Sequence, residues 1–299
     1  MDIKQAELRQ DPAAFIRREI ESFVSTAPEN RMEFFNGDPI FEKPLVGYAS
    51  GADPLFTEYK HIIGEFHLTP QEVVESATGK KLPPDKLTVI SWVLPVALET
   101  RVANRKQNKE PALRWSHARR DSDVLMEALR KHMVGLLQEQ GYIAIVSVKS
   151  PGFKTFELDG IRMSNWSERH ALYAAGLGTF GLADTMITPK GMAMRCGTLI
   201  TDLLIPPTPR TATNHMGNCL FYNGGSCHRC IERCPAGAIT EKGHDKALCR
   251  HFMQNVLKPI FKEKYGWEHD TGCALCQTAV PCESAIPVRK KQTVALESH

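Results

Sequence analysis

The chain has 299 residues, of which 42% are hydrophobic, and a formal net charge of +3 at neutral pH. This length allows one large domain or a domain with a small appendage, and the apolar share is enough for a packed core. Lys and Arg are scattered instead of forming a long basic run, so composition gives no case for a nucleic-acid partner. No apolar stretch approaches the roughly 18 residues of a membrane span, and the chain opens without a signal-peptide pattern. We therefore expect a cytoplasmic protein without a membrane anchor.

The N-terminal segment, residues 1–86, is expected to cover the rest of the chain. Asp11 is a candidate N-cap and Pro12 a favoured first helical residue, which together predict a helix over residues 11–24. The remainder of the segment is rich in Pro, Gly and Asp, with one short helix expected over residues 56–63. This composition indicates a long ordered wrap or a lid instead of a separate domain.

An α/β core is predicted over residues 87–210. A helix is expected over residues 121–139, where apolar side chains recur with the helical period, and Gly141 lies where a C-terminal cap belongs. Apolar runs rich in strand-forming residues predict strands over residues 87–94, 142–148 and 196–205. Because strand, helix and strand alternate, a sheet layered with helices is the natural architecture.

Eight of the nine cysteines fall between residues 219 and 282. The first group reads Cys219-x7-Cys227-x2-Cys230-x3-Cys234-Pro235, and the second reads Cys249, then Cys273-x2-Cys276-x5-Cys282. Cys-x2-Cys-x3-Cys-Pro is the central part of the bacterial two-cluster ferredoxin run, whose last Cys binds the other cluster. Eight thiolates also match the number that two [4Fe–4S] clusters require.

Disulfides and structural zinc are the alternatives for these cysteines. Disulfides need an oxidising compartment, for which the N-terminus gives no signal. Zinc sites also use Cys-x2-Cys pairs. Zinc ribbons, however, do not need the small-residue turn Ala236-Gly237-Ala238-Ile239 after the Cys-Pro pair, which would let backbone N–H groups approach cluster sulfurs.

The cysteine-rich region, residues 211–288, contains one predicted helix, and residues 289–299 form a polar tail. Asp245 is a candidate N-cap for a helix that runs to about Leu257 and carries Cys249. Pro259 is expected to bend or end this helix.

A short glycine-rich stretch precedes the last predicted strand of the core. Ser167 is a candidate cap for a short helix, and Gly176, Gly178 and Gly181 follow that helix. Glycines at this density let a backbone approach a large flat group closely. The Gly-x-Gly-x-x-Gly spacing does not predict a dinucleotide site, because these glycines follow a helix instead of linking a strand to a helix.

Three blocks in this order resemble the catalytic core shared by epoxyqueuosine reductases and reductive dehalogenases. They are Ser167-Glu168-Arg169-His170-Ala171 running on to Ala175-Gly176-Leu177-Gly178-Thr179-Phe180-Gly181, then Gly197-Thr198-Leu199-Ile200-Thr201-Asp202-Leu203, then the cysteine run. The resemblance is clearest over residues 87–286. It implies a nitroreductase-like cobalamin-binding α/β (α+β) domain with a C-terminal two-[4Fe–4S] ferredoxin-like domain.

The resemblance also implies ligand sets. One cluster would be held by Cys219, Cys227, Cys230 and Cys282, and the other by Cys234, Cys249, Cys273 and Cys276. The corrin ring would meet the backbone of the glycine-rich loop, which comprises Gly176, Leu177, Gly178, Thr179, Phe180 and Gly181. Cys219 is preferred to Cys196 as the first ligand, although it lies five residues before Gly224, where the common run has its Cys.

Two positions depart from the epoxyqueuosine reductase pattern. The Asp that these enzymes carry six residues before the motif Glu falls on Arg162, and their Lys after the glycine block falls on Leu182. The resemblance is therefore closer to the dehalogenases and their soluble relatives, and tRNA epoxyqueuosine is not the expected substrate.

The sequence has no Asp-x-His-x-x-Gly motif, so a cobalamin is expected to bind without a protein imidazole on cobalt. Loss of an axial donor makes cobalt easier to reduce, which suits low-potential clusters as donors. Tyr173 is a candidate proton donor, and Arg162 and Lys190 are candidates to hold an anionic substrate. Asp202 is expected to form hydrogen bonds at a strand end instead of acting in catalysis.

These observations predict a cobalamin-dependent iron–sulfur reductase that passes electrons from two clusters to a base-off corrinoid. The reaction would cleave a bond in a small molecule or process the corrinoid itself, with a low-potential donor such as a ferredoxin or flavodoxin. A flavin enzyme that holds FMN in the same fold is one alternative. A non-catalytic electron carrier is the other, although a carrier needs only the cysteine-rich region.

Overall fold

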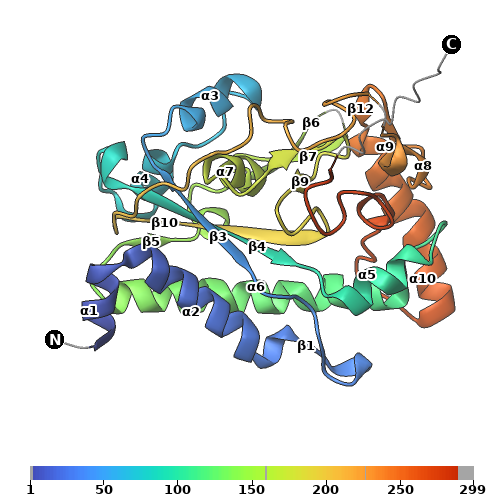
Figure 1. Cartoon of the computed structure of the whole chain (residues 1–299), viewed down its shortest axis with the longest axis horizontal. Helices are drawn as coiled ribbons and strands as arrows, with labels where there is room; N and C mark the ends of the chain where they lie inside the picture. Colours follow the sequence, from blue (N-terminus) through green and yellow to red (C-terminus); the bar gives the residue numbers. More distant parts are fainter. Residues whose placement is uncertain (1–2, 159, 226, 289–299) are drawn as a thin grey trace, which may run out of the picture.

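A four-stranded antiparallel sheet lies at the centre of the computed structural model, which describes residues 3–158, 160–225 and 227–288 (Figure 1). Across the sheet the strands are, in order, β3 (Leu45–Ser50), β4 (Thr88–Pro95), β10 (Met194–Thr201) and β5 (Ala144–Ile145). Strands β4 and β5 both pair antiparallel with β10, so they run in the same direction without touching. The predicted tail, residues 289–299, lies outside the described residues.

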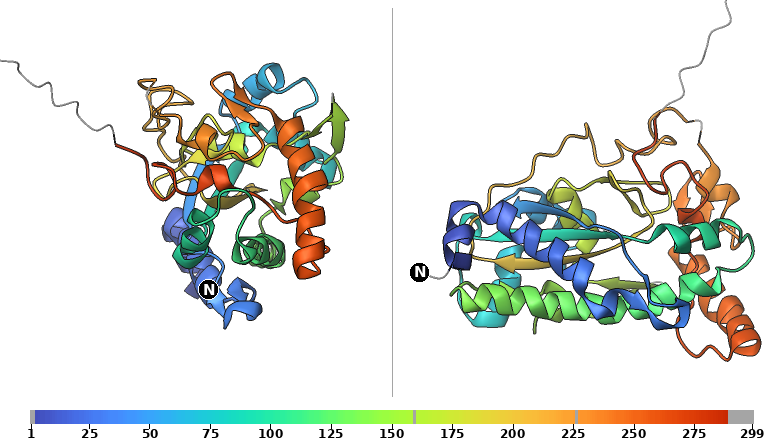
Figure 2. Two further views of the ribbon diagram at one scale, coloured as in Figure 1. Left: turned by 90° about the vertical axis from the view of Figure 1, so that its right-hand side faces the viewer. Right: turned by 60° about the horizontal axis from the view of Figure 1, so that its bottom comes forward.

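Helices cover both faces of this sheet, which explains the continuous apolar run in β4. On one face Trp92 and Leu94 pack in a core with α2 (Pro12–Thr26) and α6 (Leu113–Glu139). Figure 2 shows these two helices side by side along the sheet. On the other face Val89 and Val93 pack with α3 (Leu55–Ile62), α4 (Pro70–Thr78) and α7 (Glu168–Ala174). A strand buried on both sides does not alternate polar and apolar residues.

The helices predicted in the core and at the N-terminus are confirmed. The Asp11 carboxylate accepts a hydrogen bond from the Ala14 N–H, which satisfies one of the free donors at the start of α2. Helix α6 extends the predicted 121–139 segment towards the N-terminus and ends before Gly141, whose φ is +85°. An additional helix, α1 (Ile3–Gln10), precedes α2.

The prediction that the rest of residues 1–86 forms only a wrap with one short helix is wrong in two places. Strand β3 pairs with β4 along its whole length and is part of the central sheet. Helix α4 begins with a capping box in which the Thr69 hydroxyl accepts from the Glu72 N–H and the Glu72 carboxylate accepts from the Thr69 N–H. The Thr-Pro-x-Glu pattern at its start is the signal that could have predicted it. The short helix predicted at 56–63 is confirmed as α3.

Two predicted strands are shorter in the structure. Of residues 142–148 only β5 pairs in the sheet, and a 3-10 turn follows at Ser147–Lys149. Strand β10 ends at Thr201, where the next residue, Asp202, accepts a hydrogen bond from the Ile143 N–H at 2.7 Å. The predicted role of Asp202 at a strand end is therefore confirmed.

The helix predicted after Asp245 is longer than expected. Asp245 caps α9 (Lys246–His251), a π-helical turn follows at Phe252–Leu257, and α10 (Lys258–Tyr265) continues the path. Pro259 therefore does not end the helix; it lies in the first turn of α10, directly after the π-helical turn. Figure 2 shows this helical rod beside the rest of the fold.

The remaining elements are short hairpins and short helices. They are the hairpins β1 (Arg31–Met32) with β2 (Asp38–Pro39), β6 (Thr155–Leu158) with β7 (Ile161–Ser164), β8 (Thr179–Phe180) with β9 (Met186–Ile187) and β11 (Ile239–Thr240) with β12 (Gly243–His244), and the helices α5 (Leu98–Arg105) and α8 (Arg229–Glu232). Within the described ranges, no helix combines the length and the apolar character that crossing a bilayer requires.

One close approach inside the sheet gives a test of this packing. Gly197 in β10 lies opposite Trp92 in β4, and a Cβ at Gly197 would lie 2.5 Å from the Trp92 indole. We expect Gly197→Ala to lower the free energy of unfolding by about 1–3 kcal/mol, because the buried indole has no room to move. Gly135→Ala in α6 is the control: nothing lies near its Cβ, so helix propensity predicts a gain of up to about 1 kcal/mol. Urea unfolding measures both, and an unchanged Gly197→Ala protein would show that Trp92 can repack.

Candidate functional site

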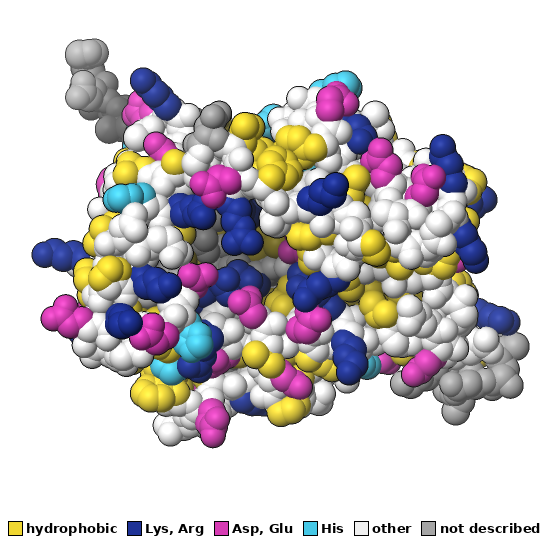
Figure 3. All heavy atoms as spheres, turned by 180° about the vertical axis from the view of Figure 1, so that it is seen from behind, with side chains coloured by type: hydrophobic (Ala, Val, Ile, Leu, Met, Phe, Trp, Pro, Cys, Tyr) yellow, Lys and Arg dark blue, Asp and Glu magenta, His cyan; other side chains and the backbone are white. Residues whose placement is uncertain are grey.

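A cavity of about 1420 Å³ lies between the sheet, helices α6 and α7, and the cysteine-rich loops. It is larger than the roughly 300–1,000 Å³ of pockets that hold drug-sized ligands. Figure 3 shows the hollow in the face opposite to that of Figure 1, with Lys and Arg side chains gathered around it. The cavity therefore has room for a large ligand and a basic rim.

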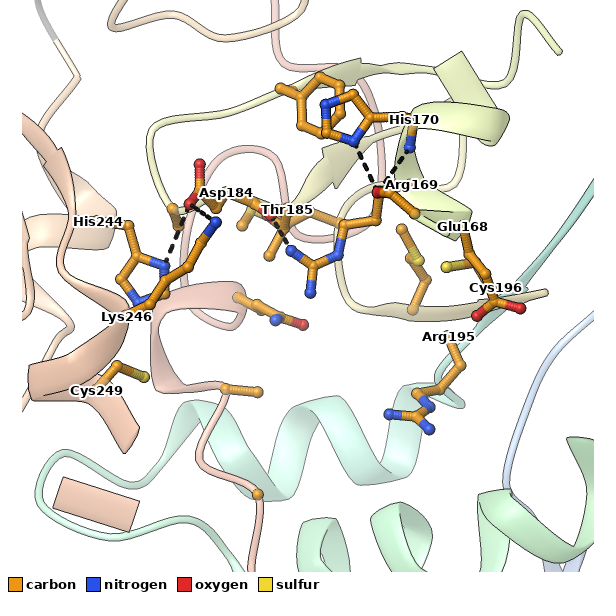
Figure 4. Close-up of a pocket in the computed structure, with 18 of the residues that line it drawn as sticks. Glu168, Arg169, His170, Asp184, Thr185, Arg195, Cys196, His244, Lys246 and Cys249 are labelled. Atoms are coloured by element: carbon orange, nitrogen blue, oxygen red, sulfur yellow. Dashed lines mark hydrogen bonds and ion pairs between the residues drawn. The ribbon is translucent and has the colours of Figure 1, made fainter. Parts of the chain in front are cut away.

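Helix α7 places three consecutive side chains on the cavity wall (Figure 4). The Ser167 hydroxyl accepts a hydrogen bond from the His170 N–H and fixes the start of the helix. The Glu168 carboxylate accepts from the Arg130 guanidinium of α6 at 3.0 Å. Burial raises the pKa of Glu168, and the Arg130 charge opposes that shift. Arg169, the next residue along α7, is exposed.

His170 belongs to an aromatic group beneath the cavity. Its ring lies 4.9 Å from the Tyr59 ring and 4.7 Å from the Phe180 ring, and its Nδ1 lies 2.7 Å from the Ser167 hydroxyl. His67 accepts a hydrogen bond from the Ser167 N–H through Nε2. Burial lowers the pKa of each of these two histidines to about 4, so both are neutral at pH 7.

A shared carboxylate joins two arginines at another part of the wall. Asp123 of α6 accepts from Arg119 at 2.7 Å and from Arg195 of β10 at 2.9 Å. Desolvation lowers the pKa of Arg195, and the Arg119 charge lowers it further. One carboxylate thus serves two cations at this place.

Asp184 ties the core to the cysteine-rich region on the opposite side of the cavity (Figure 4). Its carboxylate lies 3.1 Å from the Lys246 ammonium and 3.8 Å from Nδ1 of His244. Asp184 itself has a left-handed backbone, with φ of +54°, at the turn between β8 and β9. These contacts hold α9, which carries Cys249, against the turn.

The first predicted set of cysteines comes together in the structure. Burial raises the pKa of Cys282 to about 12, and its other contributing neighbours are Cys219, Cys230 and Cys227. Cys219, Cys230 and Cys282 also pack in one small core with Leu182 and Ile187, and Cys234 and Cys276 of the second set pack against the same core. Cys196, the alternative first ligand, packs in a different core next to β4.

The second predicted set also comes together, and it lines the cavity. Burial raises the pKa of Cys273 to about 12, and Cys249 and Cys234 raise it further. The pKa of Cys276 is raised by burial and by the same neighbours. All four of these cysteines are cavity-lining residues.

Backbone donors lie close to these sulfurs, as the turn after Cys234 suggested. The Ala238 N–H donates to Cys234 Sγ at 3.3 Å, and Gly237 has a positive φ of +62° that shapes this turn. Such N–H groups stabilise a negatively charged cluster and tune its potential. Among the described residues no three His, Cys, Asp or Glu side chains converge on the position of a single metal ion. A cubane requires a wider arrangement, because each thiolate binds a different iron.

The loop that carries Cys282 is fixed by a buried carboxylate. Glu283 is 4% exposed and accepts from Arg105 Nε at 2.9 Å with each of its two oxygens. The Met192 N–H donates to the Cys282 carbonyl, and the Ala193 N–H donates to the Glu283 carbonyl. This loop therefore docks directly on the residues that precede β10.

The predicted glycine-rich loop reaches the cavity only in part. Phe180 lines the cavity, whereas the other five residues do not: Gly176, Leu177, Gly178, Thr179 and Gly181. A Cβ at Gly176 would lie 2.7 Å from the Pro209 carbonyl, and one at Gly178 would lie 2.6 Å from the Ile187 carbonyl. These glycines allow close packing of the chain against itself, so the expectation that they face a ring needs this correction.

The structure places only some of the other candidate residues on the cavity wall. Tyr173 and Arg162 line the cavity, whereas Lys190 does not. Leu182 is buried beside the first cysteine set, so it has no polar role there. The sequence analysis missed Arg119, Asp123 and Arg195, which come from two separate elements and share no local motif. Glu168 is the motif Glu of the family resemblance, but no role was predicted for it.

Three histidines, His170, His215 and His244, also line the cavity. The missing Asp-x-His-x-x-Gly motif predicted a cofactor without a protein imidazole. The structure shows that imidazoles are nevertheless present on the wall.

Comparisons with curated proteins give partial matches to one enzyme. The epoxyqueuosine reductase of Bacillus anthracis is 32% identical over 120 residues, which are 38% of this chain and 29% of the relative. That of Gloeobacter violaceus is 31% identical over 124 residues, which are 39% of this chain and 34% of the relative. The matched region thus spans about a third of the length of these relatives. No family model matches the sequence.

Solved structures give a likeness of fold. A reductive dehalogenase, whose structure is described as suggesting a mechanism for B12-dependent dehalogenation, aligns with a TM-score of 0.50 and 16% identity over 82% of this chain and 30% of that chain. A selenomethionine-labelled epoxyqueuosine reductase aligns with a TM-score of 0.47 and 16% identity over 92% of this chain and 67% of that chain. The mixed α/β fold is similar to that of the dehalogenase.

The buried histidines predict a pH-dependent stability. His67 has a pKa of about 4 in the folded protein and about 6.5 in an unfolded chain, so the unfolded state binds the proton more tightly. The contribution of neutral His67 to the free energy of unfolding is fully present above pH 6.5 and is lost as the pH falls towards 4. At pH 5 the loss is about 2 kcal/mol. We expect His67→Gln, which keeps an acceptor for the Ser167 N–H, to reduce the fall in unfolding free energy between pH 7.5 and pH 5.

His61→Gln is the matched control, because the His61 side chain is 74% exposed. Urea unfolding at the two pH values should give the same fall for this variant as for the unchanged protein. An equal fall in the His67→Gln protein would contradict a low pKa for His67.

Proposed function

We propose that this chain is a reductase in which two [4Fe–4S] clusters deliver electrons to cobalamin held in the large cavity, for reductive cleavage of a bond in a small molecule. The observation that carries the proposal is the arrangement of the cysteines. Cys219, Cys230 and Cys282 pack in one small core, and Cys234, Cys249, Cys273 and Cys276 all line the cavity. Electron entry would come from a low-potential protein such as a ferredoxin or flavodoxin.

The assignment of the two clusters rests on which cysteines lie near one another in the structure. Cys219, Cys227, Cys230 and Cys282 would hold one cluster, and Cys234, Cys249, Cys273 and Cys276 the other. The crossing of Cys282 and Cys234 between the two halves is what a two-cluster ferredoxin requires. It supports a ferredoxin-like region at residues 211–288 packed on a nitroreductase-like core.

The assignment of cobalamin rests on the cavity. Its volume exceeds that of ordinary small-molecule pockets, its wall includes both charged and apolar side chains, and the fold is similar to that of a reductive dehalogenase. When bound, a corrinoid supplies a cobalt that low-potential donors can bring to a strongly reducing state. Phe180, Tyr59 and His170 line the cavity and would contact the corrinoid, and the second cysteine set lines the same cavity.

Tyr173 is the proposed proton donor. It follows Glu168 and His170 on α7, is partly exposed, and lines the cavity with its ring 6.4 Å from the Phe180 ring. A phenol O–H at this place can protonate a departing group. Tyr173→Phe should retain iron and corrinoid and lose turnover.

We do not propose epoxyqueuosine as the substrate, although the curated relatives carry that name. By the family resemblance, Arg162 replaces an Asp, and Leu182 replaces a Lys and is buried in an apolar core. A substrate that depended on those two groups would not find them here.

Cluster content gives the first test. We expect Cys227→Ala and Cys276→Ala each to lose about half of the iron and acid-labile sulfide, because each removes a ligand of one cluster only. Cys196→Ala is the control, since this cysteine lines the cavity but belongs to neither set. Iron and sulfide analysis after anaerobic purification measures the result. Zinc in place of iron, or full iron in either variant, would overturn the assignment.

Anaerobic titration with cobalamin tests the organic cofactor. We expect about one cobalamin per chain and an electron paramagnetic resonance signal of base-off Co(II) without nitrogen splitting. Nitrogen splitting would instead assign an axial ligand to one of the wall histidines. Tight binding of FMN instead of cobalamin would assign a flavin as the cofactor. A cluster-loaded protein that bound neither would be assigned as an electron carrier.

A further inference from the structure

The paired arginines on the cavity wall suggest which ligands the cavity selects. We propose that Arg119 and Arg195, which share the carboxylate of Asp123, bind an anionic group of the ligand, either a carboxylate or a phosphate. This inference deepens the proposed function and depends on it for the identity of the cavity as the reaction site.

The charge balance at this place leaves a positive excess. Arg119 and Arg195 each donate one hydrogen bond to Asp123, through Nη1 and Nη2 respectively. No other carboxylate pairs with either guanidinium in the described part of the chain. A guanidinium carries five N–H donors in a planar fork, so each arginine keeps an edge free for a second acceptor.

Both arginines are held in place by the fold. Arg195 lies in β10, whose neighbour Leu94 in β4 is fully buried. Arg119 lies on α6, and its Cγ would be only 3.0 Å from a Cβ at Gly272. Gly272 has a φ of +57°, so this residue both turns the chain before Cys273 and leaves room for the arginine stem. Fixed side chains lose little rotamer freedom when a ligand binds.

Partial burial strengthens the attraction for an anion. The Arg119 and Arg195 side chains are 27% and 37% exposed, and both line the cavity. Bidentate bonds from arginine to carboxylate or phosphate are the strong, charge-assisted kind, and they gain from a surrounding with little water. Arg130 and Lys246, two other cations of the wall, are each engaged by a carboxylate of their own.

The apolar part of the wall lies next to this pair. Met126 and Trp115 of α6 and Met194 of β10 line the same cavity. A ligand with an apolar body and one terminal anion would fit such a surface, as an aromatic carboxylate does. The phosphate of a cobalamin nucleotide tail is also an anion. The experiment therefore has to show whether the anionic group belongs to the substrate or to the cofactor.

The test uses benzoate and inorganic phosphate as anionic probes and benzamide as the neutral match of benzoate. Binding is measured by calorimetry and thermal shift on protein purified without oxygen, with clusters loaded and no corrinoid added. We expect benzoate or phosphate to bind and benzamide to bind at least about tenfold more weakly. The double variant Arg119→Gln/Arg195→Gln should lose the preference for the anion, and Arg18→Gln on the outer surface should keep it.

Asp123→Asn gives a result of opposite sign. Removing this carboxylate frees donors on both arginines and raises the positive charge, so anion affinity should increase about tenfold. A variant that merely damaged the fold would bind less. Equal binding of benzoate and benzamide, no anion binding at all, or unchanged anion binding in the double-glutamine variant would overturn the proposal.

Cobinamide, which lacks the nucleotide tail and its phosphate, identifies the source of the anion. If the arginines hold the tail phosphate, the double variant should bind cobalamin about tenfold more weakly and bind cobinamide normally. If they hold the substrate, both corrinoids should bind normally while benzoate or phosphate binding is lost. Failure to bind any corrinoid would overturn the proposed cofactor and leave the anion measurement standing, so the two failures are distinguishable.

Discussion

The buried carboxylate of Glu283 holds the two parts of this molecule in register. It accepts from the Arg105 guanidinium with both oxygens and from the Ala279 N–H at 2.7 Å. Arg233, which directly precedes Cys234, donates to the Leu275 and Thr278 carbonyls and to the Gln107 carbonyl. Buried charges require such partners, because an unpaired one costs several kcal/mol. The cysteine loops can therefore dock on α5 and β10 in one way only.

That docking creates the cavity, since neither part encloses it alone. The sheet, α6 and α7 supply one wall, and the loops with Cys234, Cys249 and Cys273 supply another. Contacts such as Asp184 with Lys246 cross between the parts at the rim. The cysteines of the second predicted set and the charged wall of the cavity are thus positioned by the same set of ion pairs, and a change in the docking would alter both together.

Local signals in the sequence predicted much of this and missed what depends on distant pairing. Caps at Asp11, Ser167 and Asp245 follow from short patterns because each acts within a few residues. Strand β3 was missed because its residues lie among Pro and Gly, and only pairing with β4 makes them a strand. The cavity charges were missed for a similar reason, since Asp123 and Arg195 are 72 residues apart and meet only when β10 packs near α6.

The glycines show how one pattern can have two physical causes. A residue without a Cβ lets the backbone approach any surface, and the sequence alone does not say whether that surface is a cofactor or the protein itself. Here Gly176 faces the carbonyls of Thr208 and Pro209, which lie on the connection to the cysteine-rich region. The loop therefore fixes the path of the chain from the sheet to the cysteine-rich region. Its influence on a ligand would pass through Phe180, the single residue of the predicted set that the fold brings to the wall.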